Sequence, residues 1–261
     1  MDQPGQKLMS VDMDAAHGGR WPSLRGRNGR EWLWRRDAPG RASVRPGDPF
    51  VDAGGMEECL PTIGGEPDHG DVWSRPWRPD GDGLAVEVDG RRLWRRTTVD
   101  GSGVHSSYRL TADPGWWFIW AAHTLIDVAP GARILAPEGR PMRVNSDDGT
   151  AERHWPMHGG TDLSRLGDDD GTAYMIIIPE LPEITVVDGA DRITFRLRVT
   201  GQPFAVAIWR NLGGWPSGEP YRSIGIEPML GHSPTLSMAR TGKSAVVPPD
   251  GRVEWSLTID A

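Results

Sequence analysis

The sequence predicts an all-β protein, built as one large antiparallel β-sandwich. Short apolar runs recur along the whole chain and are separated by turns rich in Gly, Pro and Asp, a pattern typical of antiparallel strands. The chain holds 34 Gly and 23 Pro among 261 residues, so long helices are not expected to dominate. No segment has the composition of a linker. We therefore expect a single domain over residues 1–261, with residues 1–16 as a loosely ordered N-terminal arm.

The N-terminal half of the chain predicts strands joined by tight turns. Asn28-Gly29 is a strong hairpin signal, and residues 31–34 continue as a strand. Residues 38–67 are rich in Gly, Pro and Asp, which indicates a long loop crossing the sheet, and such loops carry functional sites. Beyond this loop we expect a hairpin of residues 84–88 and 92–94, followed by residues 108–111 and 117–123 as paired strands.

The C-terminal half continues the β pattern after a polar interval. Residues 137–172 are turn-rich and show no clear period. Residues 173–178 form a short apolar run that ends at Pro179, as in a buried strand. In residues 193–199 apolar side chains alternate with Arg, which indicates a strand with one wet face. Further strands are expected at residues 132–135, 184–187, 204–209 and 253–259.

Charge and composition exclude several classes of partner. A net charge of −7 argues against a nucleic-acid partner, because neutralising phosphates requires a basic face. Cys59 is the one cysteine, so no internal disulfide is possible, which fits a reducing compartment, and a small buried hydrophobe is its simplest role. No secretory signal precedes the first strands, and the longest apolar run is too short to cross a bilayer. We therefore expect a cytoplasmic protein without a membrane partner.

The most informative run of residues lies near the C-terminus, where an apolar strand over residues 224–226 meets Glu227 and Pro228. Proline has no backbone N–H, so we expect strand pairing to stop there and Glu227 to project from a strand end toward a cleft. His69 in Asp-His-Gly and His123 in Ala-Ala-His-Thr are the residues expected to meet it. One carboxylate and two imidazoles are a working acid/base set near neutral pH.

Each of these residues also has a plainer interpretation. A Glu before Pro is usually a solvated turn residue, a His in Asp-His-Gly is usually a turn residue, and a His ending an aromatic strand is usually a hydrogen-bonded core edge. His154 and His158 have the spacing of a helical zinc pair, but Pro156 between them disfavours a helix and no third ligand is evident. We therefore expect no metal site. Only the joint occurrence of Glu227, His69 and His123 raises them above their plain interpretations.

The order of five motifs supports a functional interpretation of these three residues. Residues 18–24 with 29–34 look like an opening hairpin, residues 54–61 form a Gly-Gly…Pro segment, and His69 begins a His-Gly stretch that reaches Arg75. Together with His123 and Glu227, this order resembles the aldose 1-epimerase (galactose mutarotase-like) superfamily over about residues 17–240. The resemblance implies the large twisted β-sandwich called the supersandwich.

The resemblance also implies roles for individual residues. Glu227 matches the base and His123 the acid that open a sugar ring, and His69 matches the second histidine, which binds the substrate. Arg75 is the candidate clamp on a sugar hydroxyl, although its spacing from His69 is longer than in the hexose epimerases. Trp209 and Asn211, with the glycine-rich loop after them, would form one rim of the sugar site. No cofactor is implied. An aspartate that binds sugar hydroxyls has no matching motif here; Asp162 and Asp191 fall in the right interval.

The leading hypothesis is an enzyme that interconverts the α and β anomers of a hexose or related sugar. One alternative is a non-catalytic carbohydrate-binding protein on the same fold. Another is a hexose-6-phosphate epimerase, in which arginines converge at the cleft to bind phosphate; Arg20, Arg75, Arg78 and Arg210 are the candidates. A third is an interaction module, since 13 Trp is a high count and an exposed aromatic patch suits a partner. The sequence does not predict an oligomeric state.

Overall fold

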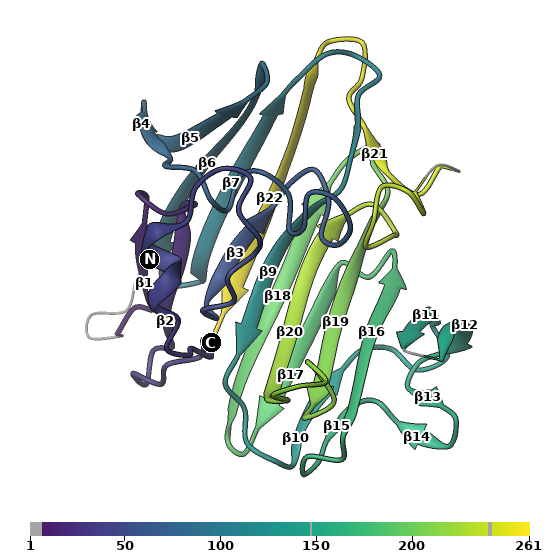
Figure 1. Ribbon diagram of the computed structural model, residues 1–261. Coiled ribbons are helices and arrows are strands. Elements are labelled where there is room, and N and C mark those ends of the chain that lie inside the picture. The colour runs from purple at the N-terminus through teal and green to yellow at the C-terminus, as the bar shows by residue number, and fades with distance from the viewer. Residues whose placement is uncertain (1–6, 147, 240–241) are drawn as a thin grey trace.

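Two large antiparallel sheets form the molecule, as the computed structural model shows for residues 7–146, 148–239 and 242–261 (Figure 1). The first sheet contains, in spatial order, β1 (Ser10–Asp14), β2 (Arg20–Arg25), β3 (Met56–Cys59), β9 (Trp120–Ile126), β20 (Arg222–Leu230), β19 (Phe204–Leu212), β16 (Thr172–Pro179), β11 (Pro141–Ser146), β12 (Gly149–His154), β13 (Met157–His158) and β14 (Thr161–Asp162).

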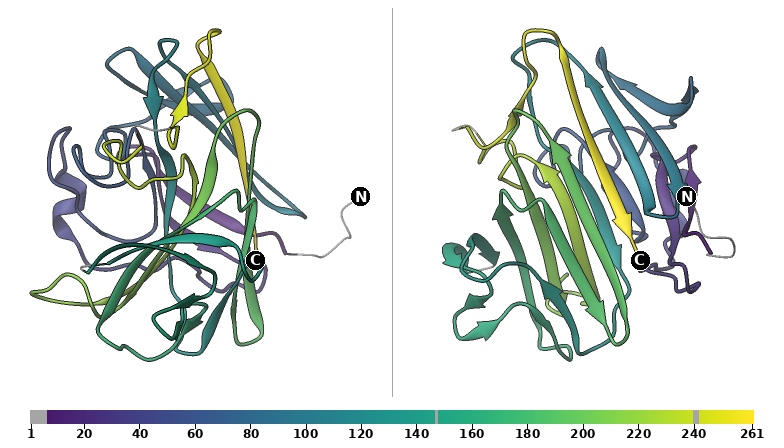
Figure 2. Two further views of the ribbon diagram at one scale, coloured as in Figure 1. Left: turned by 90° about the vertical axis from the view of Figure 1, so that its right-hand side faces the viewer. Right: turned by 180° about the vertical axis from the view of Figure 1, so that it is seen from behind.

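The second sheet lies behind the first in the view of Figure 1, and Figure 2 shows it from its own side, with the yellow strand β22 running across it. Its strands are, in order, β15 (Arg165–Leu166), β10 (Ala132–Leu135), β17 (Glu183–Asp188), β18 (Asp191–Val199), β22 (Arg252–Asp260), β7 (Gly103–Thr111), β6 (Arg91–Asp100), β5 (Gly83–Val88) and β4 (Arg78–Asp80). A two-stranded ribbon of β8 (Trp117–Phe118) and β21 (Ala245–Val246) and a 3₁₀ helix, η1 (Pro39–Ser43), complete the elements.

The main core fills the space between the two sheets. In β9, Trp120, Ala122 and Ile126 face this core, and in the second sheet Tyr108 and Trp255 meet them, with ring centroids of Trp120 and Tyr108 4.8 Å apart. Because side chains alternate along a strand, the residues between these positions point to the opposite face of the first sheet. The all-β sandwich predicted from the sequence is confirmed.

A buried ion pair links the two sheets inside this core. Glu58 of β3 accepts hydrogen bonds from Arg95 Nη1 of β6 (2.6 Å), Tyr108 Oη of β7 (3.0 Å) and Trp120 Nε1 of β9 (2.7 Å). Arg95 also donates to the backbone carbonyl of Gly19. The carboxylate therefore has three donors, which is the condition under which a buried charge is tolerated.

Several element predictions need correction. Residues 108–111 and 117–123 do not pair: β7 pairs with β6 and β22, whereas β9 pairs with β3 and β20 in the other sheet. Residues 38–67 are not a continuous loop, because β3 lies within them. Residues 31–34 form isolated bridges rather than a strand. The turn-rich residues 137–172 contain short strands at the edges of both sheets. Few of the side chains on these strands are buried.

The expected N-terminal arm is also partly wrong. Residues 1–6 lie outside the described residues, but Ser10–Asp14 form β1 and pair with β2. Met9 is buried and Val11 packs against the core, so this segment is anchored by apolar side chains. Among the residues described, no helix is long and apolar enough to cross a membrane.

Candidate functional site

The outer face of the first sheet carries a set of side chains that the core does not use. The alternation that sends Trp120 and Ala122 of β9 inward sends His123 outward, and in β20 the same alternation places Glu227 on that outer face. Trp209 of β19 lies on it as well. Three neighbouring strands, β9, β20 and β19, thus bring residues from distant parts of the sequence together.

Glu227 does not lie at a strand end, contrary to our expectation. It is within β20, paired with Ala207 of β19, and the strand continues through Pro228 to Leu230. The pairing of β20 with β9 is recorded at Gly225 and again at Met229 but not between them. Pro228 lacks an N–H, so a local break in one ladder accommodates it without ending the strand.

The Glu227 carboxylate is buried and lacks hydrogen bonds from the described residues. It has no exposed surface, and neither oxygen has a hydrogen-bond partner within the described chain. Burial raises the pKa of Glu227 above its ordinary 4.5, and the neighbouring His123 partly offsets this. Gly225 makes room for the group, since a Cβ there would lie 2.7 Å from Glu227 Oε1. Buried polar groups without partners are rare, and they gather at functional sites.

His123 is the nearest polar group to this carboxylate. Its Nε2 lies 3.8 Å from Glu227 Oε1, and its ring reaches the cavity above with 8% of its surface exposed. Burial lowers the pKa of His123 below 6.5, while the Glu227 carboxylate opposes that change. The two groups therefore have pKa values that move toward each other, as suits a proton donor and acceptor working in one pH range.

His69 approaches from the loop that follows β3. Its backbone N–H donates to Ile63 O (2.7 Å) and its Nδ1 lies 3.0 Å from Asp68 Oδ1. The next residue must be Gly70, because its φ is +77° and a Cβ would lie 2.1 Å from Leu60 O. This turn holds the His69 ring with its centroid 4.9 Å from that of His123.

Aromatic side chains complete a cavity of about 270 Å³ over these imidazoles. The Phe50 ring stacks on His69 with centroids 3.6 Å apart. The opposite wall consists of Trp209, Trp215 and Tyr221. The remaining lining residues are Asp52, Ile63, Gly64, Asp68, Leu125, Met175 and Pro234. The cavity thus combines apolar ring faces with a few polar groups, as small-molecule sites do.

Asn211 supports this wall without lining the cavity. It is fully buried, and its amide nitrogen donates to the carbonyls of Trp215 (2.9 Å) and Tyr221 (2.7 Å). Its Oδ1 accepts from the N–H groups of Gly214 (2.9 Å) and Trp215 (3.0 Å). These bonds leave the amide no free donor for a ligand, so Asn211 positions the loop after β19.

The arginines proposed from the sequence do not converge on the cavity. Arg75 and Arg78 line a separate depression together with Asp80 and Glu87. Arg20 lies 3.2 Å from Glu57, and Arg210 points away, near Asp170 (3.5 Å). Among the described residues that line the cavity, none is Lys or Arg.

The sequence interpretation missed the cavity's other aromatic and acidic side chains, Phe50, Asp52, Asp68 and Tyr221, among further lining residues. Asp68 had a local signal, since it precedes His69. Asp52 and Tyr221 had no local sequence signal. Tyr221 Oη donates a hydrogen bond to Asp52 Oδ2 (2.6 Å), and these residues are 169 positions apart in the sequence. Asp162 and Asp191, considered for a hydroxyl-binding role, instead pair with Arg165 and Arg30.

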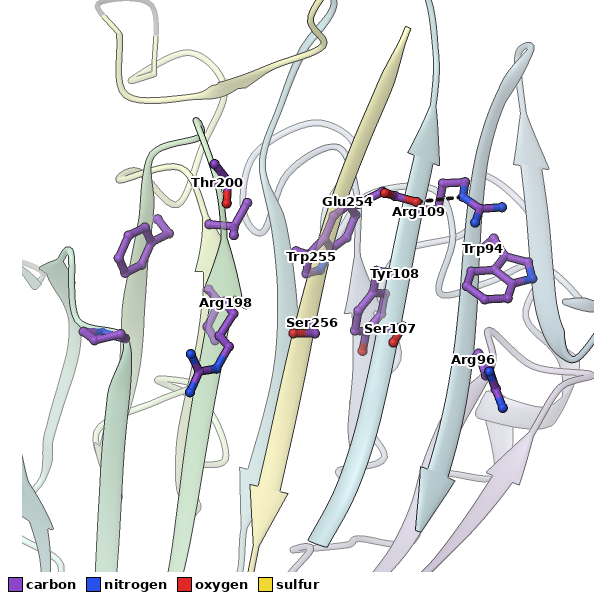
Figure 3. A pocket seen from close by; sticks show the side chains of 14 residues that line it. Trp94, Arg96, Ser107, Tyr108, Arg109, Arg198, Thr200, Glu254, Trp255 and Ser256 are labelled. Atoms are coloured by element: carbon purple, nitrogen blue, oxygen red, sulfur yellow. Dashed lines mark hydrogen bonds and ion pairs between the residues drawn. The ribbon is translucent and has the colours of Figure 1, made fainter. Parts of the chain in front are cut away.

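A larger hollow of about 760 Å³ lies on the outer face of the second sheet (Figure 3). Most of its side chains stand on β6, β7, β18 and β22, and Arg109 and Glu254, which form an ion pair (3.1 Å), are among them. No histidine is found among the described residues lining it. It lacks convergent acid/base groups, so we assign the candidate site to the smaller cavity over His123.

Within the described ranges, no group of three or more His, Cys, Asp or Glu is placed to hold a metal ion. His154 and His158 lie on β12 and β13, joined by a turn, rather than on one helix face.

Comparison with known proteins gives a fold and no close relative. No protein-family model and no curated protein matches the sequence. A solved protein of Synechocystis is similar, with a TM-score of 0.71 and 14% identity over 99% of this chain and 96% of its own. A protein of Klebsiella pneumoniae, provisionally assigned as an aldose 1-epimerase, has a TM-score of 0.71 and 15% identity over 97% of this chain and 76% of its own.

A third solved structure, from Escherichia coli and provisionally assigned as an aldose 1-epimerase, has a TM-score of 0.65 and 14% identity over 97% of this chain and 98% of its own. The chain therefore has the galactose mutarotase-like fold that these solved structures share. The resemblance inferred from the motifs is confirmed at the level of fold. Because one fold supports many functions, activity has to be argued from the site.

Proposed function

We propose that the protein is an aldose 1-epimerase-like isomerase that interconverts the α and β anomers of a neutral hexose or related sugar. The observation that carries this proposal is the fully buried carboxylate of Glu227, which has no hydrogen bond from the described residues and lies 3.8 Å from His123, a residue that lines the aromatic cavity. A buried polar group without a hydrogen-bond partner lowers the stability of the fold by about 1–3 kcal/mol. A catalytic role for Glu227 would explain why the fold retains such a group.

The reaction needs one base and one acid. Glu227 accepts the proton of the C1 hydroxyl, and protonated His123 donates a proton to the ring oxygen O5 as the C1–O5 bond breaks and the C1 carbonyl forms. Rotation about C1–C2 exposes the other face of the carbonyl, and the reverse transfers close the ring. Proton transfers from positioned groups contribute ~10²–10⁴-fold each.

The remaining groups bind the sugar. His69, held by Asp68 and stacked on Phe50, supplies a hydrogen bond near O5. Trp209 offers an apolar ring to the C–H face of the sugar. Arg75 has no place in this account, because it lies in another depression.

Charge favours a neutral sugar over a phosphorylated one. Asp52 and Asp68 line the cavity, Glu227 lies beneath it, and no Lys or Arg is among its described lining residues. A phosphate would meet carboxylates here rather than the Arg forks that usually bind it. We place the reaction in the cytoplasm.

A second candidate function is a carbohydrate-binding protein without catalysis. One observation favours it: Glu227 has no exposed surface, so the sugar must displace cavity side chains to reach the carboxylate. Apo geometry often tightens only when substrate binds, so burial does not by itself remove the catalytic role.

The test is acceleration of anomer exchange, measured by NMR at equilibrium for a panel of neutral aldoses and their 6-phosphates. Low buffer concentration and neutral pH keep spontaneous exchange slow. We expect acceleration for at least one neutral aldose and a weaker effect for its phosphate. If the folded protein binds sugars by saturation transfer but accelerates none, the binding function replaces the enzymatic one.

A further inference from the structure

The aromatic wall of the cavity extends beyond the space that a single sugar ring fills. Trp215 lines the cavity, yet 49% of its surface is exposed. Its ring lies edge-on to Trp209 (centroids 6.0 Å apart) and to Tyr221 (6.2 Å). An exposed indole at the mouth of a cavity is a surface that a ligand can cover.

Trp215 is held in place by its backbone. Asn211 bonds to both its N–H (3.0 Å) and its carbonyl (2.9 Å). The neighbouring ring of Tyr221 is fixed as well, by a hydrogen bond to Asp52 (2.6 Å) and by stacking on Trp34 (centroids 5.5 Å apart). A ligand that stacks here meets a loop whose backbone is already ordered and a neighbouring Tyr221 ring that is already fixed, so less entropy is lost on binding.

The cavity has room for only one ring of a larger sugar. About 270 Å³ is below the ~300–1,000 Å³ of pockets for drug-sized ligands, so it suits one small ring over His123. A second ring joined to the first would leave the cavity at its mouth, where the exposed indole lies. The absence of Lys and Arg among the described lining residues suits a ligand whose ring inside the cavity is neutral.

We propose that Trp215 forms a second subsite, which binds the sugar ring next to the reducing end, so that neutral reducing disaccharides and longer glycans are the preferred substrates. This inference rests on the proposed aldose 1-epimerase-like activity, because the first test measures a rate of anomer exchange. It adds a substrate class that the acid/base groups alone do not define.

The test compares sugars that share the same reducing ring. Anomer exchange is measured for glucose with maltose and cellobiose, and for galactose with galactobiose, using wild-type protein and Trp215→Leu, Trp215→Phe and Trp117→Leu. Trp117 is the matched control, because it is 45% exposed and does not line the cavity. Unchanged circular dichroism and Tm establish that each variant is folded.

We expect the KM of at least one disaccharide to be about two- to tenfold below that of its monosaccharide, the range that one aromatic stacking contact gives. Trp215→Leu brings this ratio close to one, Trp215→Phe retains part of it, and Trp117→Leu leaves it as in wild type. Equal KM values for both sugars in the wild type, or a ratio unaffected by Trp215→Leu, overturn the inference.

If the protein is not an epimerase, the experiments give a different set of results. If wild type accelerates exchange of no sugar, binding of the same pairs is measured by titration calorimetry. Tighter binding of a disaccharide that is lost in Trp215→Leu then supports the subsite without the enzyme. No difference in affinity within any pair, or no binding at all, overturns it.

Discussion

At the scale of single residues, the environment of Glu227 opposes stability and fits the catalytic role proposed for it. Its carboxylate is placed by strand alternation, given room by Gly225 and deprived of hydrogen-bond donors within the described chain. Burial raises its pKa, and burial lowers that of His123. An enzyme that needs a proton acceptor and a proton donor together benefits from this convergence.

The convergence predicts the pH profile of kcat/KM. The productive form of the free protein has ionised Glu227 and protonated His123. Activity should therefore fall on the acid side at a pH above 4.5 and on the alkaline side at a pH below 6.5, giving a narrow bell with its maximum on the acid side of neutrality. Rates of anomer exchange across pH 4–8, corrected for the spontaneous reaction, check this; a plateau extending to pH 8 would contradict it.

The same carboxylate predicts a stability change in Glu227→Gln. Because the folded-state pKa is raised, the folded protein binds more protons than the unfolded chain between pH 4.5 and that pKa, and it loses stability as pH rises through this range. Removing the ionisable group should raise stability by about 1.4 kcal/mol for each pH unit by which the folded-state pKa exceeds 4.5, once the pH is above that pKa, and the gain should shrink as pH falls toward 4.5.

Thermal unfolding of wild type and variant at several pH values measures this, and a rise in Tm of a few degrees is expected. The exposed Glu254→Gln is the matched control. A variant less stable than wild type at pH 8 would show that the carboxylate has a stabilising partner after all.

At the scale of elements, the loop after β19 depends on one amide. Asn211 makes hydrogen bonds to backbone groups of Gly214, Trp215 and Tyr221, so Asn211→Ala leaves several of these groups without partners. We expect a ~10–100-fold loss in kcat/KM, because the aromatic wall is misplaced. Asn28→Ala, at a surface amide bound to Asp191, should have no such effect.

Hydrogen exchange over residues 212–222 gives the second readout. Faster exchange in Asn211→Ala with unchanged exchange in β20 would support the positioning role. Unaltered exchange in the loop together with lower activity would instead point to direct contact between Asn211 and the sugar.

Elements with a strong local signal were predictable, and those set by distant contacts were not. The strand predicted at residues 173–178, which is β16, and the alternation of residues 193–199 were evident because burial leaves an apolar or alternating pattern. β11 to β15 were not, because edge strands bury few side chains. The pairing of β9 with β3 was hidden as well, since Asp-Pro-Gly at residues 113–115 looks like a hairpin turn yet carries the chain from one sheet to the other.

The residues of the candidate site likewise fall into those that the sequence indicated and those that it did not. Glu227, His123 and His69, which were singled out by the order of their motifs, lie close together in the structure, and their roles stay a prediction. Arg75 was misplaced, since the chain between it and His69 turns away from the cavity. Asp52 and Tyr221 could not have been found, because only the folded sheet brings them into contact.

At the scale of the whole molecule, the two sheets are joined by the buried pair of Glu58 and Arg95. Removing one partner of such a pair leaves an uncompensated charge, so Glu58→Gln should destabilise the fold by about 3–5 kcal/mol. Breaking the exposed pair of Arg109 and Glu254 should cost no more than about 1 kcal/mol. Denaturant unfolding measures both, and equal effects of the two changes would contradict the view that this pair stabilises the sandwich.

The measurement that tests the central claim most directly is equilibrium anomer exchange of a neutral aldose with wild type, Glu227→Gln and Glu254→Gln. We predict acceleration by wild type and Glu254→Gln, and loss of acceleration by Glu227→Gln, which should still bind the sugar. Full activity of Glu227→Gln would contradict the assignment of this buried carboxylate as the base.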